Sequence, residues 1–426
     1  MVTRFPKRQG WVSVVMLATF WLVTCHLSPV PVVEAARVEH HEALRIVFLE
    51  GTPYDVGRQH GELLREEVRT SVSRVLGYFR RYLKIPWVRS WLVNWWLDDP
   101  WRQAQPFVTS DLLEELRGLA DGSGVPLREL YRLHAVPERT YSCANLAAWG
   151  RVTAGGRLVH VRNLDWNIDA GIQDAATVFV VRPAGKRAFV NVGWAGFIGV
   201  LTGINDAQLS IGQIGAETVD ATFRGEPMAF LMRRVLEEAG TLDEAVALIL
   251  EAKRTVGVNY VVADARTPRG VVVETTRRHA RVFEADDAAE HGVSYARPVA
   301  DAVFRADIAV DPIIRDRQRA SGGDPRRPGL EDPAGSSAYD VRYLGQAAGL
   351  LASMGHLTAT SAQAIARAVA PSSNVQSVIF AWPELWVANA HGLTPAAQAT
   401  YHRLDLTRLF SIESEPPPEH ATRPGS

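Results

Sequence analysis

The sequence predicts an α+β protein in which helices are layered on antiparallel sheets. One observation is a group of amphipathic helical segments that occupies most of residues 53–133. Another is a series of short apolar strands, joined by tight turns, within residues 143–213. The last is a pair of helices over residues 228–252, after which the chain returns to strands. Helices and strands grouped in this way, rather than alternating, favour an α+β arrangement over a parallel α/β one.

The composition is that of a globular chain with a large core. Hydrophobic residues make up 47% of the 426 residues, and the formal net charge is −1. A charge so near zero gives no reason to expect nucleic acid as a partner. The two cysteines are Cys25 and Cys143. Because only Cys143 lies outside the N-terminal segment, we expect no internal disulfide framework.

Residues 1–36 are typical of an export signal. A positively charged start precedes an almost wholly apolar run over residues 11–24, and Val33-Glu34-Ala35 offers the small residues of a cleavage site. The apolar run is too short for a comfortable membrane span. We therefore expect an exported protein, periplasmic or extracellular, with a cleaved signal. A lipid anchor on Cys25 and an uncleaved membrane tether are the alternatives.

Residues 37–142 are expected to be mostly helical. Thr52 is a plausible N-cap for the long helix that starts here, and Pro53 fits its first position. Gly57 and Gly61 share one face of that helix and permit the close approach of another backbone. The predicted elements are a strand over residues 43–49 and helices over residues 54–83, 112–119 and 127–133.

Trp87, Trp91 and Trp95 recur every fourth residue and form one stripe on a helix predicted over residues 86–101. Such a stripe usually packs into a core. A lid over a site, or a lipid-facing surface, is the alternative interpretation. His134 is expected to be a hydrogen-bonded structural residue.

The stretch over residues 140–166 is predicted to form a hairpin around Cys143. Two apolar runs are joined by Gly155-Gly156, so the second strand returns beside the first. The return strand ends in Arg162 and Asp165, which the hairpin can bring near the sulfur. A thiol beside a fixed cation is a candidate nucleophile, because the thiolate is the reactive form. A buried structural cysteine beside a surface Arg/Asp pair is an equally open interpretation of these residues alone.

The remainder of the chain continues the α+β pattern. Thr241, with Glu244 three residues later, is a helix N-cap signature. Residues 321–335 read as an exposed loop, and the end of the chain as a disordered tail. Strands are predicted over residues 176–182, 187–192, 199–203, 209–213, 256–263, 270–274, 281–283, 375–380 and 385–387, and helices over residues 228–238, 241–252, 313–319, 339–354 and 361–369.

Motifs for cofactors and metals are not found. The glycines of GWAGFIGVLTG, residues 193–203, lack the spacing of a dinucleotide fingerprint, and there is no P-loop. His40-His41-Glu42 is not the paired-histidine zinc motif. We therefore expect neither a cofactor nor a metal.

The hairpin sequence carries a family resemblance. C-x-x-L-A-x-W-G-x-x-T, a glycine turn and R-N-L-D-W together resemble the penicillin acyltransferase (isopenicillin N acyltransferase-like) branch of the N-terminal nucleophile (Ntn) hydrolases. Bile-salt hydrolases, penicillin V acylases and acid ceramidase are similar at a greater distance. The resemblance spans about residues 45–405, because further similar segments are GTPYDVGRQHGELL, GWAGFIGVLTGIND, GVNYVVADA and NVQSVIF.

The resemblance implies a four-layer αββα sandwich and self-cleavage of the Ser142–Cys143 bond. Residues 37–142 would then be a prosegment, residues 143–410 the catalytic domain and residues 411–426 a tail. Cleavage would give Cys143 a free α-amine with a pKa of about 7.7–8.0, which can accept the thiol proton near neutral pH. The same residue would supply both nucleophile and base.

Roles for other residues follow from the same resemblance. Asp165 would hold the new α-amine, and Arg162 would set the local field and help to orient substrate. Asn259 is a candidate for stabilising the oxyanion, and Gln213 is a weaker one. Arg342 resembles a site arginine of the bile-salt hydrolases.

Two positions depart from the family pattern. Where the family usually has Thr-Asn-His, with an asparagine that donates to the oxyanion, this chain has Ala306-Asp307-Ile308. An ionised Asp307 cannot donate a hydrogen bond to the oxyanion. Either Asp307 is protonated, or another residue donates to the oxyanion, or the activity is altered. Ala144 stands where Thr or Ser is usual.

We expect an amide hydrolase or acyltransferase that acts on the carbon–nitrogen bond of a small N-acyl substrate. One alternative is an altered family member that keeps the fold as a binding protein, motivated by Asp307. Another is a lipid amidase or phospholipase-like hydrolase with a lipid-like substrate, motivated by the tryptophan stripe.

Overall fold

The computed structural model describes residues 36–82, 89–138, 142–294, 296–320 and 338–411. Residues 1–35 of the predicted export signal, Trp87, the loop over residues 321–335 and the tail after Ser411 lie outside these residues. Within them, Ala36–Ser411 belongs to one compact unit. Among the described helices, none combines the length and the apolar character that crossing a membrane requires.

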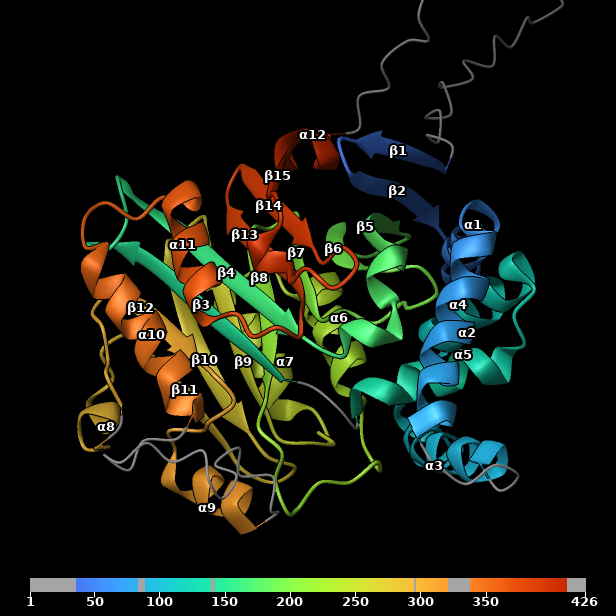
Figure 1. The fold of residues 1–426 in the computed structure, drawn as a ribbon, viewed down its shortest axis with the longest axis horizontal. Coiled ribbons are helices and arrows are strands. Elements are labelled where there is room, and N and C mark those ends of the chain that lie inside the picture. The colour runs from blue at the N-terminus through green and yellow to red at the C-terminus, as the bar shows by residue number, and fades with distance from the viewer. Residues whose placement is uncertain (1–35, 83–88, 139–141, 295, 321–337, 412–426) are drawn as a thin grey trace, which may run out of the picture. The chain divides into compact units, whose positions relative to one another are not determined.

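The larger sheet has nine strands in the order β1-β2-β5-β6-β7-β8-β9-β10-β11 (Figure 1). Neighbouring strands are antiparallel except β2 and β5, which pair in parallel. This pairing departs from the expected all-antiparallel arrangement, and the long helical segment between the two strands supplies the crossover that a parallel pair needs. The strands are β1 Arg37–His41, β2 Leu44–Gly51, β5 Ala176–Pro183, β6 Phe189–Trp194, β7 Thr202–Asn205, β8 Leu209–Gly215, β9 Val258–Asp264, β10 Arg269–Thr275 and β11 Ala280–Phe283.

The smaller sheet has six antiparallel strands in the order β12-β3-β4-β13-β14-β15. Its centre is the predicted hairpin, which places Cys143 opposite Leu164 and Ser142 opposite Asp165. Gly155 and Gly156 turn the chain with φ of +74° and +73°, a conformation that favours glycine. The strands are β3 Ser142–Gly150, β4 Gly156–Asp165, β12 Ala302–Arg305, β13 Asn374–Ala381, β14 Glu384–Asn389 and β15 His402–Asp405.

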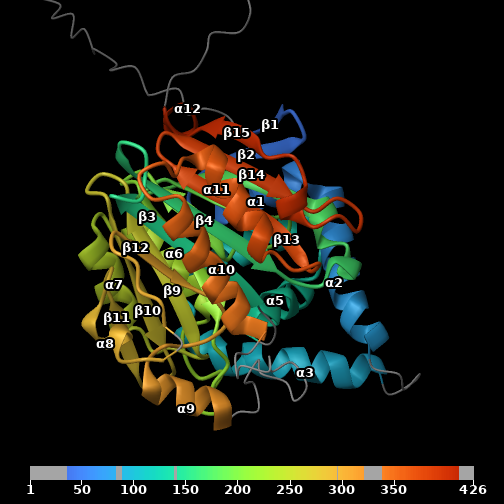
Figure 2. The same cartoon turned by 60° about the vertical axis from the view of Figure 1, so that its left-hand side comes forward.

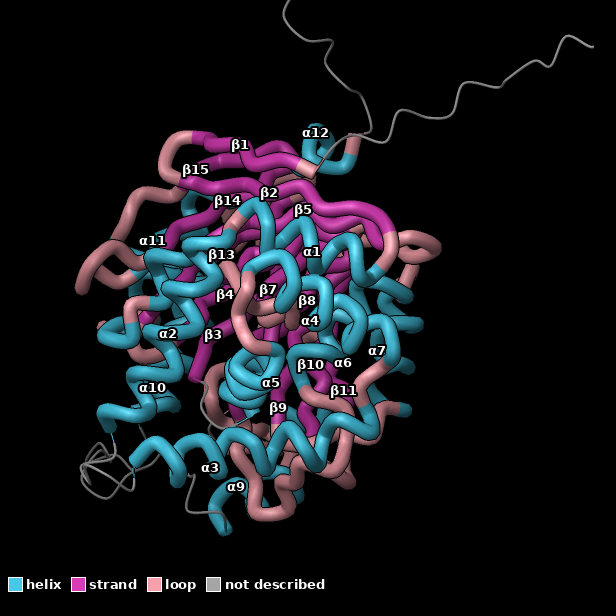
Figure 3. Tube along the Cα trace, turned by 90° about the vertical axis from the view of Figure 1, so that its right-hand side faces the viewer, coloured by secondary structure: helices cyan, strands magenta, loops and turns pink. Residues whose placement is uncertain are grey.

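The two sheets pack face to face, and helices cover their outer faces, which confirms the predicted αββα sandwich. Figure 2 brings α10 and α11 forward over the smaller sheet. α6 and α7 pack on the larger sheet, and α1, α2, α4 and α5 lie together beside it (Figure 3). The helices are α1 Pro53–Leu63, α2 Arg65–Tyr82, α3 Arg89–Ala104, α4 Ser110–Ser123, α5 Leu127–Ala135, α6 Met228–Glu238, α7 Leu242–Glu251, α8 Ala288–His291, α9 Pro312–Ala320, α10 Ala338–Ala352, α11 Ala359–Val369 and α12 Leu406–Phe410.

The predicted glycine face of the first helix is a close contact in the structure. A Cβ added at Gly57 would lie 1.9 Å from the carbonyl oxygen of Glu115 on α4, and one added at Gly61 would lie 2.5 Å from the nitrogen of Ser123. Thr52 caps α1 and Thr241 caps α7, as predicted, each accepting a main-chain N–H three residues on.

Some boundaries differ from the predicted ones. The single helix predicted over residues 54–83 is two helices, separated at Leu64. The strand predicted over residues 199–203 begins only at Thr202, because residues 195–201 form a loop in which Gly196 has φ of +92°. The short strand β12 was not predicted, although it leads directly to Asp307.

Candidate active site

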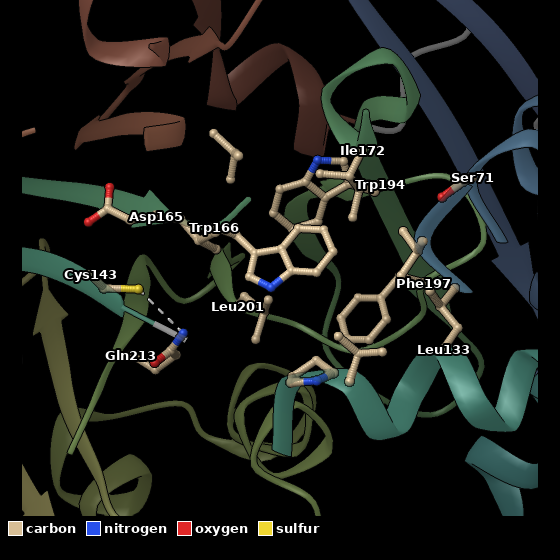
Figure 4. Close-up of a pocket in the computed structure, with 15 residues that line it drawn as sticks. Ser71, Leu133, Cys143, Asp165, Trp166, Ile172, Trp194, Phe197, Leu201 and Gln213 are labelled. Carbon is tan, nitrogen blue, oxygen red and sulfur yellow. Dashed lines mark hydrogen bonds between the residues drawn. The ribbon is translucent and has the colours of Figure 1, made fainter. Parts of the chain in front are cut away.

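Cys143 lies near the start of β3, between the two sheets and against an apolar cavity (Figure 4). Its side chain is fully buried, and the Nε2 atom of Gln213 on β8 donates a hydrogen bond to Sγ over 3.6 Å. Burial raises the pKa of the Cys143 thiol to about 11, and the neighbouring Arg162 guanidinium opposes that shift only in part. The thiol is therefore protonated at neutral pH, and it would need a base in order to act as a nucleophile.

Asp165 lies at the end of β4 and also lines the cavity. Its Oδ2 accepts a hydrogen bond from Nη2 of Arg342 over 2.5 Å, and its Oδ1 accepts one from Nδ2 of Asn374 over 2.9 Å. Burial raises the pKa of Asp165, whereas Arg342 and Asn374 oppose that change. The carboxylate is thus held in one orientation beside Cys143.

Asp307 accepts a hydrogen bond from the main-chain N–H of Cys143, with 2.9 Å between that nitrogen and Oδ1. Its Oδ2 lies 3.4 Å from Nη1 of Arg342. Arg342 therefore bridges the carboxylates of Asp165 and Asp307, and its Nε donates to the carbonyl oxygen of Val369. A carboxylate oxygen that accepts the Cys143 N–H is not arranged to donate to an oxyanion.

Arg162 is buried on β4, where its Nη1 donates to the carbonyl oxygen of Asn163 and its Nε to that of Leu201. Nη2 has no hydrogen-bond partner among the described residues. A Cβ at Gly212 of β8 would lie 2.6 Å from the Arg162 Cδ. A glycine at residue 212 thus gives the guanidinium room between the sheets.

The two amide candidates for the oxyanion site are placed differently. Gln213 lines the cavity beside the sulfur. Asn259, the candidate favoured from sequence, donates through Nδ2 to the carbonyl oxygens of Ala306 and Ile308, over 3.5 Å and 3.4 Å. Asn259 therefore holds the segment on either side of Asp307, and Gln213 is the amide of the two that faces the Cys143 sulfur.

An apolar cavity of about 60 Å³ leads away from Cys143. In Figure 4 the indole of Trp166 and the side chains of Leu201 and Phe197 lie beyond the sulfur, and Ser71 of α2 lies on the far side. Trp194 also lines the cavity, and its Nε1 is buried without a partner among the described residues. Sequence reasoning missed this lining, because its members come from separate helices, strands and loops.

Buried histidines near the cavity have structural roles. His134 of α5 accepts the N–H of Ile198 at Nε2 over 2.9 Å, and its Nδ1 lies 2.7 Å from the carbonyl oxygen of Leu130. His60 of α1 accepts the N–H of Gly196 over 2.9 Å. Within the described ranges, no group of three or more His, Cys, Asp or Glu side chains is arranged to bind a metal.

Residues 152–294 match the family described as acyl-coenzyme A:6-aminopenicillanic acid acyl-transferase. The family resemblance is thereby confirmed. The matched segment contains Arg162, Asp165, Gln213 and Asn259, and Cys143 precedes it.

Curated relatives extend the similarity. The chain is 27% identical over 286 residues to the protein dcd1B of Dictyostelium discoideum, covering 62% of this chain and 57% of that protein. It is 26% identical over 207 residues to the acid ceramidase of Rattus norvegicus, covering 43% of this chain and 51% of that one. The chain thus spans little more than half the length of these relatives.

Solved structures are similar at lower identity. An N-acylethanolamine-hydrolyzing acid amidase ortholog of Caenorhabditis elegans shares 17% identity with a TM-score of 0.40, covering 56% of this chain and 92% of that one. The penicillin V acylase of Agrobacterium tumefaciens shares 14% identity with a TM-score of 0.39, covering 62% of this chain and 87% of that one.

Proposed function

We propose that this protein is a self-processing cysteine hydrolase or acyltransferase that acts on the amide bond of an N-acyl substrate. The observation that carries the proposal is the position of Cys143. Its sulfur faces an apolar cavity and an amide donor, and its nitrogen contacts a carboxylate. The family match and the names of the relatives support the same class of reaction.

The first step in this proposal is cleavage of the Ser142–Cys143 bond. The Cys143 sulfur attacks the carbonyl carbon of Ser142, the carbon–sulfur bond forms, and the carbon–nitrogen bond breaks. The thiol proton goes to the departing nitrogen, which becomes the α-amine of Cys143. Water then hydrolyses the thioester, which restores the thiol and leaves a carboxyl group on Ser142.

The second step repeats this chemistry on the substrate. The α-amine takes the thiol proton, and the sulfur attacks the acyl carbonyl carbon. The carbon–nitrogen bond of the substrate then breaks as the α-ammonium passes the proton to the leaving nitrogen, which gives an acyl-enzyme and a free amine. Gln213, which donates to the sulfur, is placed to donate to the oxyanion that forms there. Water or another acceptor then removes the acyl group.

The cavity defines the class of acyl group. Its lining beyond Cys143 is almost entirely apolar, with aromatic side chains from Trp166, Trp194 and Phe197. Burial of an apolar chain in such a space is favourable by about 25 cal/mol per Å² of surface. We therefore propose a lipid-like N-acyl amide with an apolar acyl chain. Trp95 of α3 is 53% exposed, so this residue of the tryptophan stripe does not pack into the core.

Export is part of the proposal and rests on the charged and apolar pattern of residues 1–36. The cleaved signal, the membrane tether and the lipid anchor on Cys25 predict different N-termini. N-terminal sequencing of protein recovered from the medium, periplasm and membrane fraction distinguishes them. Recovery of the intact N-terminus in the cytoplasm alone would contradict export.

Intact-mass analysis before and after incubation with N-acyl amides of different chain lengths tests the enzyme proposal. We expect wild type to yield a fragment that starts at Cys143 and to release free amine, and Cys143→Ala to do neither. A stable, intact wild-type chain that binds these amides without turnover would instead establish the binding-protein alternative.

A further inference from the structure

Asp307 contacts the one nitrogen in the chain whose chemistry changes on cleavage. Oδ1 of Asp307 lies 2.9 Å from the main-chain nitrogen of Cys143. Before cleavage that nitrogen belongs to the Ser142–Cys143 amide, and afterwards it is the α-amine. Asp307 is 6% exposed, so this contact is made in an environment with little competing water.

The loop that carries Asp307 is held in place on several sides. Glu274 of β10 accepts the N–H groups of Val310 and Asp311, over 2.8 Å each. Gln318 of α9 donates to the carbonyl oxygen of Asp307 over 2.5 Å, and Asn259 donates to the carbonyl oxygens on either side of it. The carboxylate is therefore positioned before any reaction begins.

Two guanidinium groups and two carboxyl groups of the described residues lie around Cys143. Arg162 and Arg342 supply two positive charges, and Asp165 and Asp307 supply two negative ones. Cleavage adds an α-ammonium whenever the new amine is protonated. With a neutral side chain at residue 307, the two guanidinium groups and the ammonium would face one carboxyl group instead of two. The Asp307 carboxylate reduces the repulsion among these positive charges.

We propose that Asp307 binds the nitrogen of Cys143 at both stages, first as acceptor for the scissile amide N–H and then as acceptor for the α-amine. This inference rests on the proposed self-cleavage. It gives Asp307 a role opposite to that of the donating asparagine in the resembling family. Arg342, 3.4 Å from Oδ2, orients the carboxylate so that Oδ1 faces the nitrogen.

The test compares Asp307→Asn with Asp311→Asn in the full chain. Asp311 is a matched control because it lies in the same loop, is buried and caps Ile314 instead of contacting Cys143. Intact mass gives the cleaved fraction. Alkylation of Cys143 by iodoacetamide at a series of pH values, quantified on the peptide that starts at Cys143, gives the titration midpoint of the cleaved protein without any substrate.

We expect Asp307→Asn to cleave, since its side-chain oxygen can still accept the N–H. Its alkylation midpoint should move to lower pH by about one unit, because the lost negative charge favoured the protonated thiol and amine. Asp311→Asn should keep the wild-type midpoint. A folded Asp307→Asn that stays uncut, while Asp311→Asn cleaves, would contradict the acceptor role proposed for the first stage, because an acceptor oxygen alone would then not be sufficient.

Equal cleavage and equal midpoints for wild type and Asp307→Asn would overturn this inference alone. A wild-type chain that stays uncut would overturn the proposed function together with it. If Asp307→Asn does not fold, Asp307→Glu is used to test the proposed role of residue 307. It keeps the charge but displaces the contact, so we expect a midpoint near that of wild type with slower cleavage, and unchanged cleavage would count against the role.

Discussion

The guanidinium of Arg342 lies 2.5 Å from the carboxylate of Asp165, although 177 residues separate them in the chain. The side chains of Arg342 and Asp165 are 13% and 1% exposed, so the pair is largely shielded from solvent. The same guanidinium reaches Asp307 on its other side. Arg342 thereby fixes the distance between the carboxylate near the sulfur and the carboxylate at the nitrogen of Cys143.

Replacement of Arg342 by Gln should lower amide turnover by about 10²-fold, because both carboxylates lose the group that orients them. Uncompensated buried charge should also lower the free energy of unfolding by about 3 kcal/mol. Turnover and urea denaturation of the purified variant measure the two effects. Arg403→Gln is the control, since Arg403 and Glu384 form an exposed pair that contributes at most about 1 kcal/mol. Wild-type turnover in Arg342→Gln would contradict this role.

Replacing Gln213 is expected to lower turnover alone, whereas replacing Asn259 is expected to lower stability as well. Gln213→Leu removes the donor at the sulfur and should lower turnover by about 10²-fold with little change in stability. Asn259→Leu breaks the hydrogen bonds to the segment around Asp307 and should lower the melting temperature as well. Turnover and thermal denaturation of both variants distinguish the roles. The assignment of Gln213 would be wrong if only Asn259→Leu lost activity while keeping its stability.

Local sequence patterns were sufficient for one part of the site. Cys143, Arg162 and Asp165 could be brought together from sequence because one tight turn joins the two strands of the hairpin, although the register also shifts between Ala148 and Gly150. Helix caps at Thr52 and Thr241 were predictable for the same reason, since their partners lie three residues away.

Long-range contacts could not be obtained in this way. The contact between Asp307 and Cys143 depends on β12, a four-residue strand without a clear sequence signal, pairing with β3. Asn259 was preferred to Gln213 because of motif similarity. Motif similarity does not show how one sheet packs on the other, and that packing decides which amide faces the sulfur. The apolar cavity combines residues from α2, α5, β8 and several loops, so no single stretch of sequence indicated it.

The far side of the cavity should limit acyl-chain length. Leu133 of α5 lines the cavity on the side away from the sulfur, near Ser71 (Figure 4). Leu133→Trp should lower kcat/KM for long acyl chains by about tenfold or more and leave short chains nearly unaffected. A series of N-acyl amides of increasing chain length measures this effect. Leu250→Trp, at a position 41% exposed on α7, is the control. An equal loss for all chain lengths would indicate general damage to the fold rather than a length limit.

His60 and His134 should make the fold sensitive to acid. They accept the N–H groups of Gly196 and Ile198, in the loop that carries Phe197 and Leu201 of the cavity. Burial lowers the pKa of His60 to about 3 and that of His134 to about 4. Because these values lie below the unfolded value of about 6.5, the unfolded chain binds protons first as the pH falls.

Stability from these histidines is therefore complete above about pH 6.5 and declines as the pH falls toward 4, by up to about 1.4 kcal/mol per pH unit for each histidine. Urea denaturation of Cys143→Ala, which lacks the nucleophile of the proposed self-cleavage, should give a lower midpoint at pH 4.5 than at pH 7. Adding His60→Gln and His134→Gln should reduce that difference, since neutral amides do not titrate. His291→Gln, at a side chain 58% exposed, is the control and should keep the full difference. If the double histidine variant lost as much stability on acidification as its parent, other groups would govern the acid sensitivity.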